Sequence, residues 1–84
     1  MHEVLISSQA ERDLRRLPKQ MFSRVIPEIQ ALGRIPRPSG CLKLAGSKND
    51  YRIRIGDYRV LYEIDDNIRI VRIMRVRHRR EVYR

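Results

Sequence analysis

The side chains best suited to chemistry in this sequence are cations, and they are concentrated in residues 50–84. Arginine remains protonated in proteins, so it acts as an electrostatic clamp on an anion and not as a base. Cleavage of RNA without a metal needs such cations around the pentavalent phosphate, a base for the 2′-hydroxyl proton and an acid for the leaving 5′-oxygen. The sequence therefore indicates phosphodiester chemistry. The candidate groups are Arg52, Arg54, Arg59, Glu63, Arg72, Arg77, His78, Arg79 and Tyr83.

Two of these side chains are of a type that transfers protons. Histidine titrates near neutrality, which makes His78 the best general acid or base. Tyrosine has a reference pKa of about 10; several arginines near Tyr83 would favour its phenolate, and its ring could also stack on a base. Both residues have structural alternatives, because His78 could be a solvated residue of a basic tail and Tyr83 an apolar anchor of that tail. Glu63 is best explained as an ion-pair partner of Arg54 or Arg72.

A β-hairpin centred on Gly56-Asp57 is predicted to bring the arginines together. Glycine accepts the positive φ that a two-residue loop needs, and side chains alternate between the two faces along a strand. One face then carries Tyr51, Ile53, Ile55, Tyr58, Val60, Tyr62 and Ile64, and the other carries Arg52, Arg54, Arg59 and Glu63. Like charges opposite one another destabilise a hairpin, which predicts an anion on the basic face. The alternative is a solvated face whose arginine stems cover apolar surface.

A third strand is predicted over residues 68–76, after a two-residue loop at Asp66-Asn67. In that register Val71 lies opposite Tyr62 on the apolar face, and Arg72 joins the basic face. A three-residue loop would reverse the two faces. The apolar residues of this strand fall on both faces, as is typical of a central strand.

The N-terminal part begins with a strand and a helix. Residues 3–7 form a short strand candidate, and Ser8 with Glu11 matches a capping box, with Ser8 as the N-cap. A helix is therefore predicted over residues 9–16. The first strand is expected to pair beside the last strand or at an edge of the meander.

A second helix is predicted to follow Pro18, which suits a first turn. Its inner side is an apolar stripe with helical spacing. Pro27 lies within the stripe and is expected to kink the helix, and Gly33 is a plausible stop. The stripe consists of Phe22, Val25, Ile26, Ile29 and Leu32.

Together these elements predict an α+β fold in a single domain over residues 1–84. A two-helix hairpin packs on one face of a small, mainly antiparallel four-stranded sheet. The other face of the sheet is basic and partly apolar, which suits a groove for a polyanion.

The charge of the chain favours an anionic partner. The 84 residues carry 19 Lys and Arg against 10 Asp and Glu, a formal net charge of +9, and 16 of the 19 are arginine. Arginine suits bidentate contact with phosphate and stacking on bases, so nucleic acid is the first partner class and an acidic protein the second. A membrane surface ranks third, because no segment is a strongly basic amphipathic helix.

Other chemistries have little support in the sequence. Cys41 is the only cysteine, and His2 and His78 are too few for a metal cluster. We therefore expect no cofactor. No secretion signal or membrane span is expected, which favours a cytoplasmic protein.

Two stretches resemble the RelE/ParE superfamily of toxins from toxin–antitoxin pairs. They are YRIRIGDYRVLYEIDD and RVRHRREVYR, and the early LISSQAERDLRRLP extends the resemblance over nearly the whole chain. The core G-D-Y-R-V-L-Y is common to both branches, whereas the tail H-R-R-E-V-Y is similar to the RelE branch. That branch implies an endoribonuclease that cleaves mRNA in the ribosomal A site, inhibits translation and is neutralised by an acidic antitoxin. The alternatives are a ParE-like inhibitor of DNA gyrase without catalysis and a non-catalytic RNA-binding module.

The resemblance also implies roles for individual residues. The family's basic pair corresponds to Arg52 and Arg54, where many RelE-type members have lysine; because arginine cannot readily lose a proton, proton transfer is expected of Tyr83 or His78. The arginine of the G-Y-R motif corresponds to Arg59, here within G-D-Y-R. The tail arginine corresponds to Arg79, with Arg77 as an alternative. The expected catalytic residues are Arg52, Arg54, Arg59, His78, Arg79 and Tyr83, and the expected RNA contacts are Arg52, Arg54, Arg59, Arg72, Arg77 and Arg79.

Overall fold

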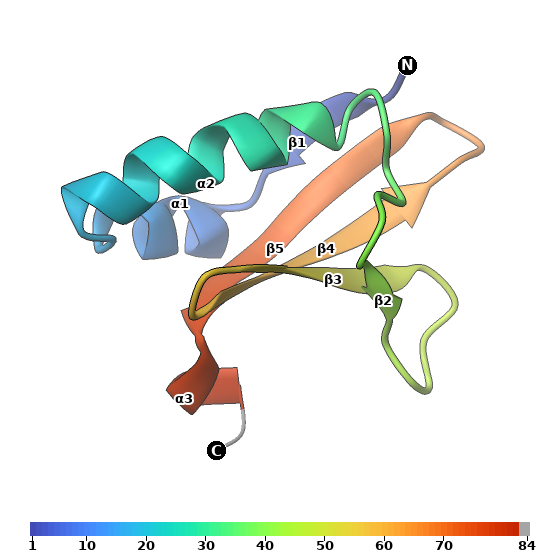
Figure 1. The fold of residues 1–84 in the computed structure, drawn as a ribbon. Helices are drawn as coiled ribbons and strands as arrows, with labels where there is room; N and C mark the ends of the chain where they lie inside the picture. The colour runs from blue at the N-terminus through green and yellow to red at the C-terminus, as the bar shows by residue number, and fades with distance from the viewer. Residues whose placement is uncertain (83–84) are drawn as a thin grey trace.

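The computed structural model describes residues 1–82, and these form a sheet with helices on one side (Figure 1). Five strands lie in the order β1-β5-β4-β3-β2; β1 and β5 are parallel, and the other neighbours are antiparallel. Helices α1 and α2 lie on the same side of the sheet, and α3 follows the end of β5. The elements are β1 (Glu3–Ile6), α1 (Ser8–Arg15), α2 (Lys19–Ala31), β2 (Leu42–Lys43), β3 (Asp50–Ile55), β4 (Tyr58–Asp65), β5 (Ile70–His78) and α3 (Arg79–Val82).

The predicted α+β class is confirmed, but the sheet has five strands and not four. The additional strand, β2, has only two residues, which pair with Arg52 and Tyr51 at the edge of β3. Leu42 and Leu44 indicate such a short strand in the sequence, but both β2 residues are exposed, so no buried periodicity marks its bounds. The first strand pairs with the last, which is one of the two predicted arrangements.

The β3–β4 hairpin has the predicted register. Ile55 pairs with Tyr58, Arg54 with Arg59, and the ladder continues to the far ends of both strands. Gly56 has a φ of 61°, as the first position of a type II′ turn requires. This turn therefore fixes which side chains share a face.

The β4–β5 connection differs from the prediction. Asp65 pairs with Ile70, so the loop spans the four residues 66–69 and not two, and Val71 lies opposite Ile64 instead of Tyr62. The Asp65 carboxylate accepts hydrogen bonds from the backbone amides of Asn67 and Ile68, and these bonds stabilise the longer turn. Because the register moves by two residues, every side chain before the bulge keeps its predicted face.

A β-bulge lies in β5 opposite Leu61 and Tyr62. Leu61 pairs with Arg75 and Tyr62 with Ile73, so Met74 is the extra residue. The bulge reverses the alternation of faces beyond it. It explains why apolar residues of β5 occupy both parities in the sequence.

Helix α1 begins one residue earlier than predicted. Its N-cap is Ser7, whose side chain accepts a hydrogen bond from the amide of Ala10, so the predicted cap at Ser8 is wrong. Ser7 also donates through its hydroxyl to the carbonyl of Met74, which ties the cap to β5. Tertiary contact thus selects between two adjacent serines.

Helix α2 continues through Pro27 to Ala31. Val25 and Ile29 are buried, as predicted, but Phe22 is 43% exposed and does not belong to the inner face. Gly33 has an ordinary φ; a Cβ there would lie 2.9 Å from the carbonyl oxygen of His2, so close approach of the N-terminal segment explains this glycine.

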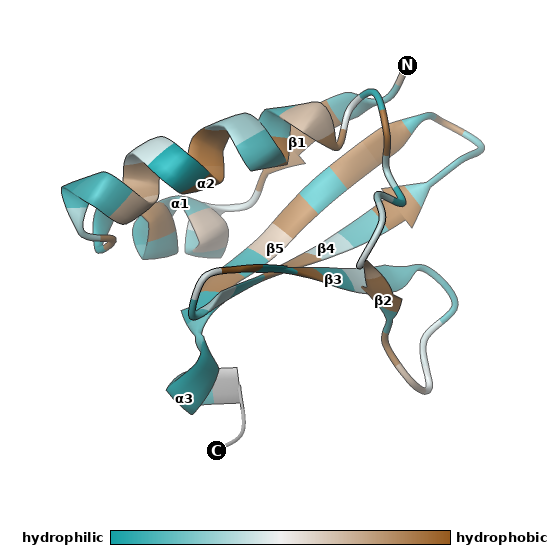
Figure 2. Cartoon of the chain, viewed as in Figure 1, coloured by the Kyte–Doolittle hydropathy of each residue, from teal (hydrophilic) through white to brown (hydrophobic). Residues whose placement is uncertain are grey.

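The core lies between the two longer helices and the sheet. Figure 2 shows apolar and polar residues alternating along β5, as expected for strands with only one covered face. No helix in residues 1–82 is long and apolar enough to cross a membrane. The core residues are Ala10, Leu14, Val25, Ile29, Leu32, Tyr51, Ile53, Ile55, Val60, Tyr62, Ile64, Val71, Ile73 and Val76.

Candidate nucleic-acid interface

Three arginines lie side by side across the uncovered face of the sheet. The register pairs Arg54 of β3 with Arg59 of β4, and Arg59 with Arg77 of β5. Residues directly opposite in antiparallel strands share a face. Their neighbours Val60 and Val76 are buried beneath the helices, so the arginines occupy the opposite side. We call Arg52, Arg54, Arg59 and Arg77 the basic face.

Arg59 is the most unusual member of this group because it is only 7% exposed. Its Nη1 donates to the carbonyl of Tyr58 at 3.4 Å, a long and weak hydrogen bond. Among residues 1–82, no carboxylate lies within ion-pair distance of Arg59. A buried cation without a counter-charge is costly, and an anion bound here would remove that cost.

A hollow of about 280 Å³ adjoins the basic face. Leu42 and the loop residue Gly40 line it from the β2 side, and we call this side its wall. The arginines of β3 and β4 that line it are Arg52, Arg54 and Arg59. Gly40 has a φ of 89°, and a Cβ there would meet nothing within 4 Å, so this wall is open. Such a hollow could accommodate a phosphate group together with part of its nucleotide.

The tail places Arg77, and not Arg79, beside Arg59. Within residues 1–82 the Nε of Arg77 is buried without a hydrogen-bond partner, while its Nη2 lies 3.3 Å from Glu81. Arg79 begins α3, its amide donates to the carbonyl of Asp57, and its Nε lies 4.0 Å from the Asp57 carboxylate. Of the two alternatives for the tail arginine, the geometry thus favours Arg77 as a phosphate contact.

His78 lies on the other side of the sheet from Arg59. It pairs with Tyr58, whose ring it meets edge-on at a centroid distance of 5.2 Å. Its Nδ1 accepts a hydrogen bond from the amide of Arg80. The structure therefore does not bring His78 together with the arginines. Tyr83, the other predicted proton carrier, lies outside the described residues.

Glu63 pairs with Arg72, one of its two predicted partners. The Oε1 of Glu63 accepts from Nη1 of Arg72 at 2.6 Å, and both side chains are partly exposed. Arg72 is thus partly neutralised, unlike Arg59. Arg72 pairs with Glu63, which shares a face with Leu61 and Arg59 of the same strand. Arg72 therefore lies on the uncovered face, as predicted.

The chemistry available on this face is electrostatic. No group of three or more His, Cys, Asp or Glu side chains in residues 1–82 is placed to hold a metal ion. Preorganised cations in a partly buried site stabilise the developing charge of a transition state more strongly than the same cations in water. The basic face is suited to hold a phosphodiester and to stabilise its pentavalent form.

Comparison with known proteins identifies the family. A family model described as the ParE toxin of the type II toxin–antitoxin system parDE matches residues 4–83.

The chain belongs to the RelE/ParE superfamily of type II toxins.

Its relatives place it with the RelE-like members of this superfamily. It is 37% identical to toxin RelG of Mycobacterium tuberculosis over 87 residues, which cover 99% of this chain and 97% of RelG. The toxin in the crystal structure of the RelBE2 toxin–antitoxin complex of M. tuberculosis is 33% identical, with a TM-score of 0.81 over 92% of this chain and 96% of that chain. The archaeal RelE–RelB complex of Pyrococcus horikoshii gives 30% identity and a TM-score of 0.77 over 93% and 94% of the two chains. The protein is therefore a RelE-like toxin of a type II toxin–antitoxin system.

The fold agrees with that of isolated Escherichia coli RelE, with a TM-score of 0.82 over 99% of this chain and 92% of that chain. At 23% identity this likeness concerns the fold alone. It accounts for the order of the strands and the position of the two helices on one face. The predicted membership of the superfamily is confirmed.

Sequence reasoning did not find the wall opposite the arginines. Gly40 and Leu42 line the hollow, yet neither is among the candidate site residues that the sequence indicates. A glycine two residues before a two-residue strand is a weak signal. Its place at the hollow depends on the pairing of Leu42 with Arg52, which the two-residue strand β2 conceals in the sequence.

Proposed function

We propose that this toxin is a metal-independent endoribonuclease that cleaves mRNA bound to the ribosome and thereby inhibits translation. One observation carries the proposal: Arg59 is nearly buried between Arg54 and Arg77, with no carboxylate partner among residues 1–82. A face that concentrates cations in this way at a hollow is suited to a phosphate of the RNA backbone.

The proposed reaction is attack of an RNA 2′-oxygen on the adjacent phosphorus. The P–O5′ bond breaks as the O2′–P bond forms, which leaves a 2′,3′-cyclic phosphate and a 5′-hydroxyl. The 2′-hydroxyl loses its proton to a base, and the 5′-oxygen gains a proton from an acid. Arg59 and its neighbours stabilise the charge that accumulates on the phosphorane oxygens.

Proton transfer is assigned to Tyr83 within this proposal. Arginine is always protonated, Glu63 is paired with Arg72, and His78 lies on the opposite side of the sheet from Arg59. The resemblance of the tail H-R-R-E-V-Y to the RelE branch supports Tyr83 in this role. Arginines near a phenol favour its ionised form.

We also propose an acidic antitoxin as the protein partner. The RelBE2, P. horikoshii and Methanococcus jannaschii proteins were crystallised as toxin–antitoxin complexes. The formal charge of +9 favours an acidic partner. Such an antitoxin would relieve growth arrest caused by expression of this chain alone.

The decisive experiment is single-turnover cleavage of mRNA on programmed ribosomes, with naked RNA as the control. Tyr83→Phe removes one hydroxyl and keeps the ring. If Tyr83 carries a proton, cleavage falls by about 10²–10⁴-fold while RNA binding is retained. Full activity of Tyr83→Phe would remove this hydroxyl from the mechanism, and absence of cleavage by the unmutated toxin would refute the proposed activity.

The second candidate is inhibition of DNA gyrase without catalysis. The observation in its favour is the match of the ParE family model to residues 4–83. A supercoiling assay with purified gyrase separates the two candidates. Inhibition of gyrase together with intact mRNA on the ribosome would establish the second.

A further inference from the structure

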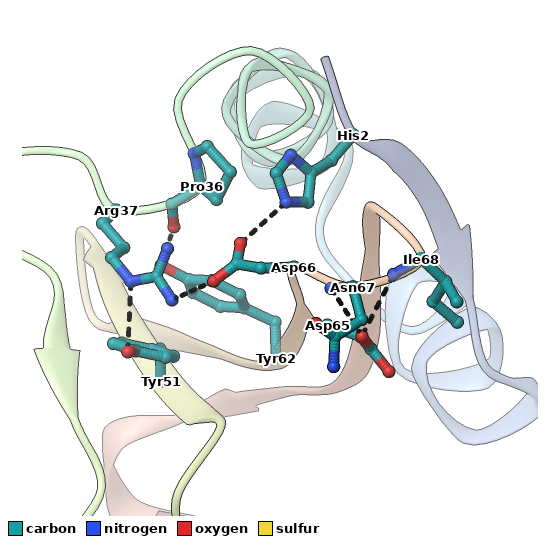
Figure 3. Close-up of polar contacts among 9 residues, drawn as sticks. All are labelled: His2, Pro36, Arg37, Tyr51, Tyr62, Asp65, Asp66, Asn67 and Ile68. Carbon is teal, nitrogen blue, oxygen red and sulfur yellow. Dashed lines mark hydrogen bonds and ion pairs between the residues drawn. The ribbon is translucent and has the colours of Figure 1, made fainter.

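A cluster of paired polar side chains lies at the end of the sheet where β1 begins, β4 ends and β3 starts (Figure 3). The Nε of Arg37 donates to the hydroxyl of Tyr51 at 3.1 Å, and its Nη2 donates to Oδ2 of Asp66 at 2.9 Å. The other carboxylate oxygen of Asp66 lies 3.0 Å from Nε2 of His2. We call Arg37, Tyr51, Asp66 and His2 the Arg37 clamp.

The clamp joins four segments that are distant in sequence. Arg37 comes from the loop after α2, Tyr51 from β3, Asp66 from the β4–β5 turn and His2 from the N-terminal segment. The guanidinium of Arg37 also lies over the ring of Tyr51, 5.1 Å from its centroid. The planar fork of an arginine can satisfy these directions together, which a lysine cannot do.

A second contact holds the same loop one residue earlier. The hydroxyl of Tyr62, which is almost fully buried, donates to the carbonyl oxygen of Pro36 at 2.8 Å. Burial raises the pKa of Tyr62, so the phenol remains a donor. The carbonyl of Pro36 and the guanidinium of Arg37 therefore anchor two consecutive residues to two neighbouring strands.

The anchored loop leads directly to the hollow beside the basic face. Gly40 follows Arg37 by three residues, and both Gly40 and Leu42 line the hollow. Leu42 pairs with Arg52, and Lys43 pairs with the clamp residue Tyr51. Because β2 has only two residues, it supplies few hydrogen bonds to hold this wall. The clamp, together with the hydrogen bond from Tyr62 to Pro36, holds the loop at its start.

We propose that Arg37 is a positioning residue for the RNA site: the clamp holds residues 36–42, which carry the wall of the hollow beside Arg52, Arg54 and Arg59. This inference rests on the proposed function and assigns to it a structural element outside the basic face. The ligand is the single-stranded RNA whose phosphate the arginines hold. Loss of the clamp lets the wall move, so the wall must be ordered when the RNA binds and RNA affinity falls.

The test uses programmed ribosomes whose mRNA carries a 2′-deoxy nucleotide at the scissile position, because the toxin can bind this mRNA but has no 2′-hydroxyl to activate. In Arg37→Gln we expect affinity for this mRNA to fall about tenfold, because a loop that is no longer held in place must be ordered when the RNA binds. Amide NMR signals of Gly40 and Leu42 should shift or broaden, while signals from α1 stay in place. Arg37→Lys, which keeps the charge but not the fork, should behave like Arg37→Gln.

Two controls separate positioning from simple loss of stability. Asp13→Asn weakens an ion pair at α1, away from the hollow, and should lower Tm without changing RNA affinity. Tyr62→Phe removes only the bond to Pro36 and should produce a smaller loss in the same direction as Arg37→Gln. In cleavage on ribosomes, Arg37→Gln should raise KM more than it lowers kcat.

The outcomes distinguish the inference from the function on which it rests. Unchanged RNA affinity and unchanged Gly40 signals in Arg37→Gln, even with a lower Tm, would overturn the positioning role. Binding of RNA without cleavage by the unmutated toxin would overturn the endoribonuclease activity and leave the clamp intact. Absence of binding of the unmutated toxin to the programmed ribosomes would overturn both.

Discussion

Arg59 and Arg75 lie on neighbouring strands, yet they meet different surroundings. Arg75 of β5 has a carboxylate partner: its Nε and Nη2 donate to the two oxygens of Asp13 at 2.8 and 3.2 Å. Arg59 of β4 is more deeply buried and, within the described residues, has only the carbonyl of Tyr58. Arg75 is thus committed to the fold, whereas Arg59 is available to an external anion.

Asp13 explains why Arg75 is structural. Strand β1 ends where Ile6 pairs with Ile73, so the edge of β5 beyond it has no neighbouring strand. The Asp13 carboxylate accepts the amide of Val76 there at 2.9 Å. Burial alone would raise the pKa of Asp13, but hydrogen bonds from Arg75 and Val76 and the charges of Arg75 and Arg77 lower it. The hydrogen bond between Asp13 and Arg75 also raises the pKa of Arg75.

Arg37 repeats the arrangement of Arg75 at the other end of the sheet. Hydrogen bonds to Asp66 and Tyr51 raise the pKa of Arg37, and Arg37 with His2 lowers the pKa of Asp66. Arg75 and Arg37 each bind a carboxylate from a distant segment, whereas Arg59 has no carboxylate partner among residues 1–82. Such a long-range ion pair, and not burial or strand position, separates a structural arginine from a candidate ligand-binding one. The partner of Arg77, Glu81, lies only four residues along the chain and ties no distant segments together.

The largest expected effect comes from Arg59→Met. We expect cleavage on programmed ribosomes to fall by about 10²–10³-fold, as on removal of one donor to a developing oxyanion. The free energy of unfolding should not fall, because an apolar side chain replaces a buried unpaired cation. Arg12→Met, on the exposed surface of α1, makes the same change in charge and should cleave normally. A large loss of stability in Arg59→Met would contradict the comparison.

Asp13→Ala should have the reverse effect of Arg59→Met, because it should lower stability and leave cleavage intact. The Oδ2 of Asp13 accepts from Nε of Arg75 and from the amide of Val76, and its Oδ1 accepts from Nη2 of Arg75. Removal of the carboxylate therefore leaves a buried amide donor and a cation without partners. We expect the free energy of unfolding, measured with urea, to fall by about 2–3 kcal/mol. Cleavage should be unchanged at temperatures where the variant is folded. The matched control is Glu11→Ala, which breaks an exposed pair with Arg15 on the same helix and should cost less than about 0.5 kcal/mol.

The salt dependence of RNA affinity should distinguish the two tail arginines, Arg77 and Arg79. Three to five phosphate contacts give a slope of log affinity against log salt of about 2–4 for single-stranded RNA. Arg77→Gln should lower this slope by about 0.7, the value for one phosphate contact. Arg79→Gln should leave it nearly unchanged, because Arg79 begins α3 and lies outside the strands that carry the basic face. Equal effects of the two substitutions would show that the strand register does not decide which arginine meets the RNA.

The smallest expected effect is on the pH dependence of stability. The folded-state pKa of Asp13 lies below its ordinary value of 3.8. Its contribution is therefore fully present above that pH and is lost as the pH falls through the folded-state pKa. The free energy of unfolding of the unmutated toxin, measured with urea, should fall as the pH is lowered through this acidic range. The free energy of unfolding of Asp13→Asn should fall less. Parallel curves for the two proteins would show that Asp13 does not carry this dependence.

Alternation and turn chemistry made part of the molecule predictable from the sequence. The Gly56-Asp57 turn and the period-two pattern around it predicted the β3–β4 register, the apolar face and the basic face, because these features depend on neighbours in sequence. The two helices followed from apolar spacing in the same way. The partner of Glu63 was limited to two candidates for the same reason.

Features that depend on contacts between distant segments were beyond the sequence. The choice of Ser7 over Ser8 as N-cap depends on Met74. The length of the β4–β5 turn is different, because it rests on local bonds from Asn67 and Ile68 to Asp65, a signal that lies within the sequence itself. Strand β2 is too short for a periodic signal. Arg75 and Asp13 are 62 residues apart, so no local pattern could show that they pair.

The sequence by itself determined that this toxin has a helical hairpin on one face of a sheet and a row of arginines on the other. Only the tertiary structure decided which arginines remain without a carboxylate. The bulge at Met74 reverses the alternation of β5, which moves Val76 into the core and Arg77 beside Arg59. One inserted residue exchanges the two faces of a strand, and ion pairs form between side chains that only the packed fold brings together.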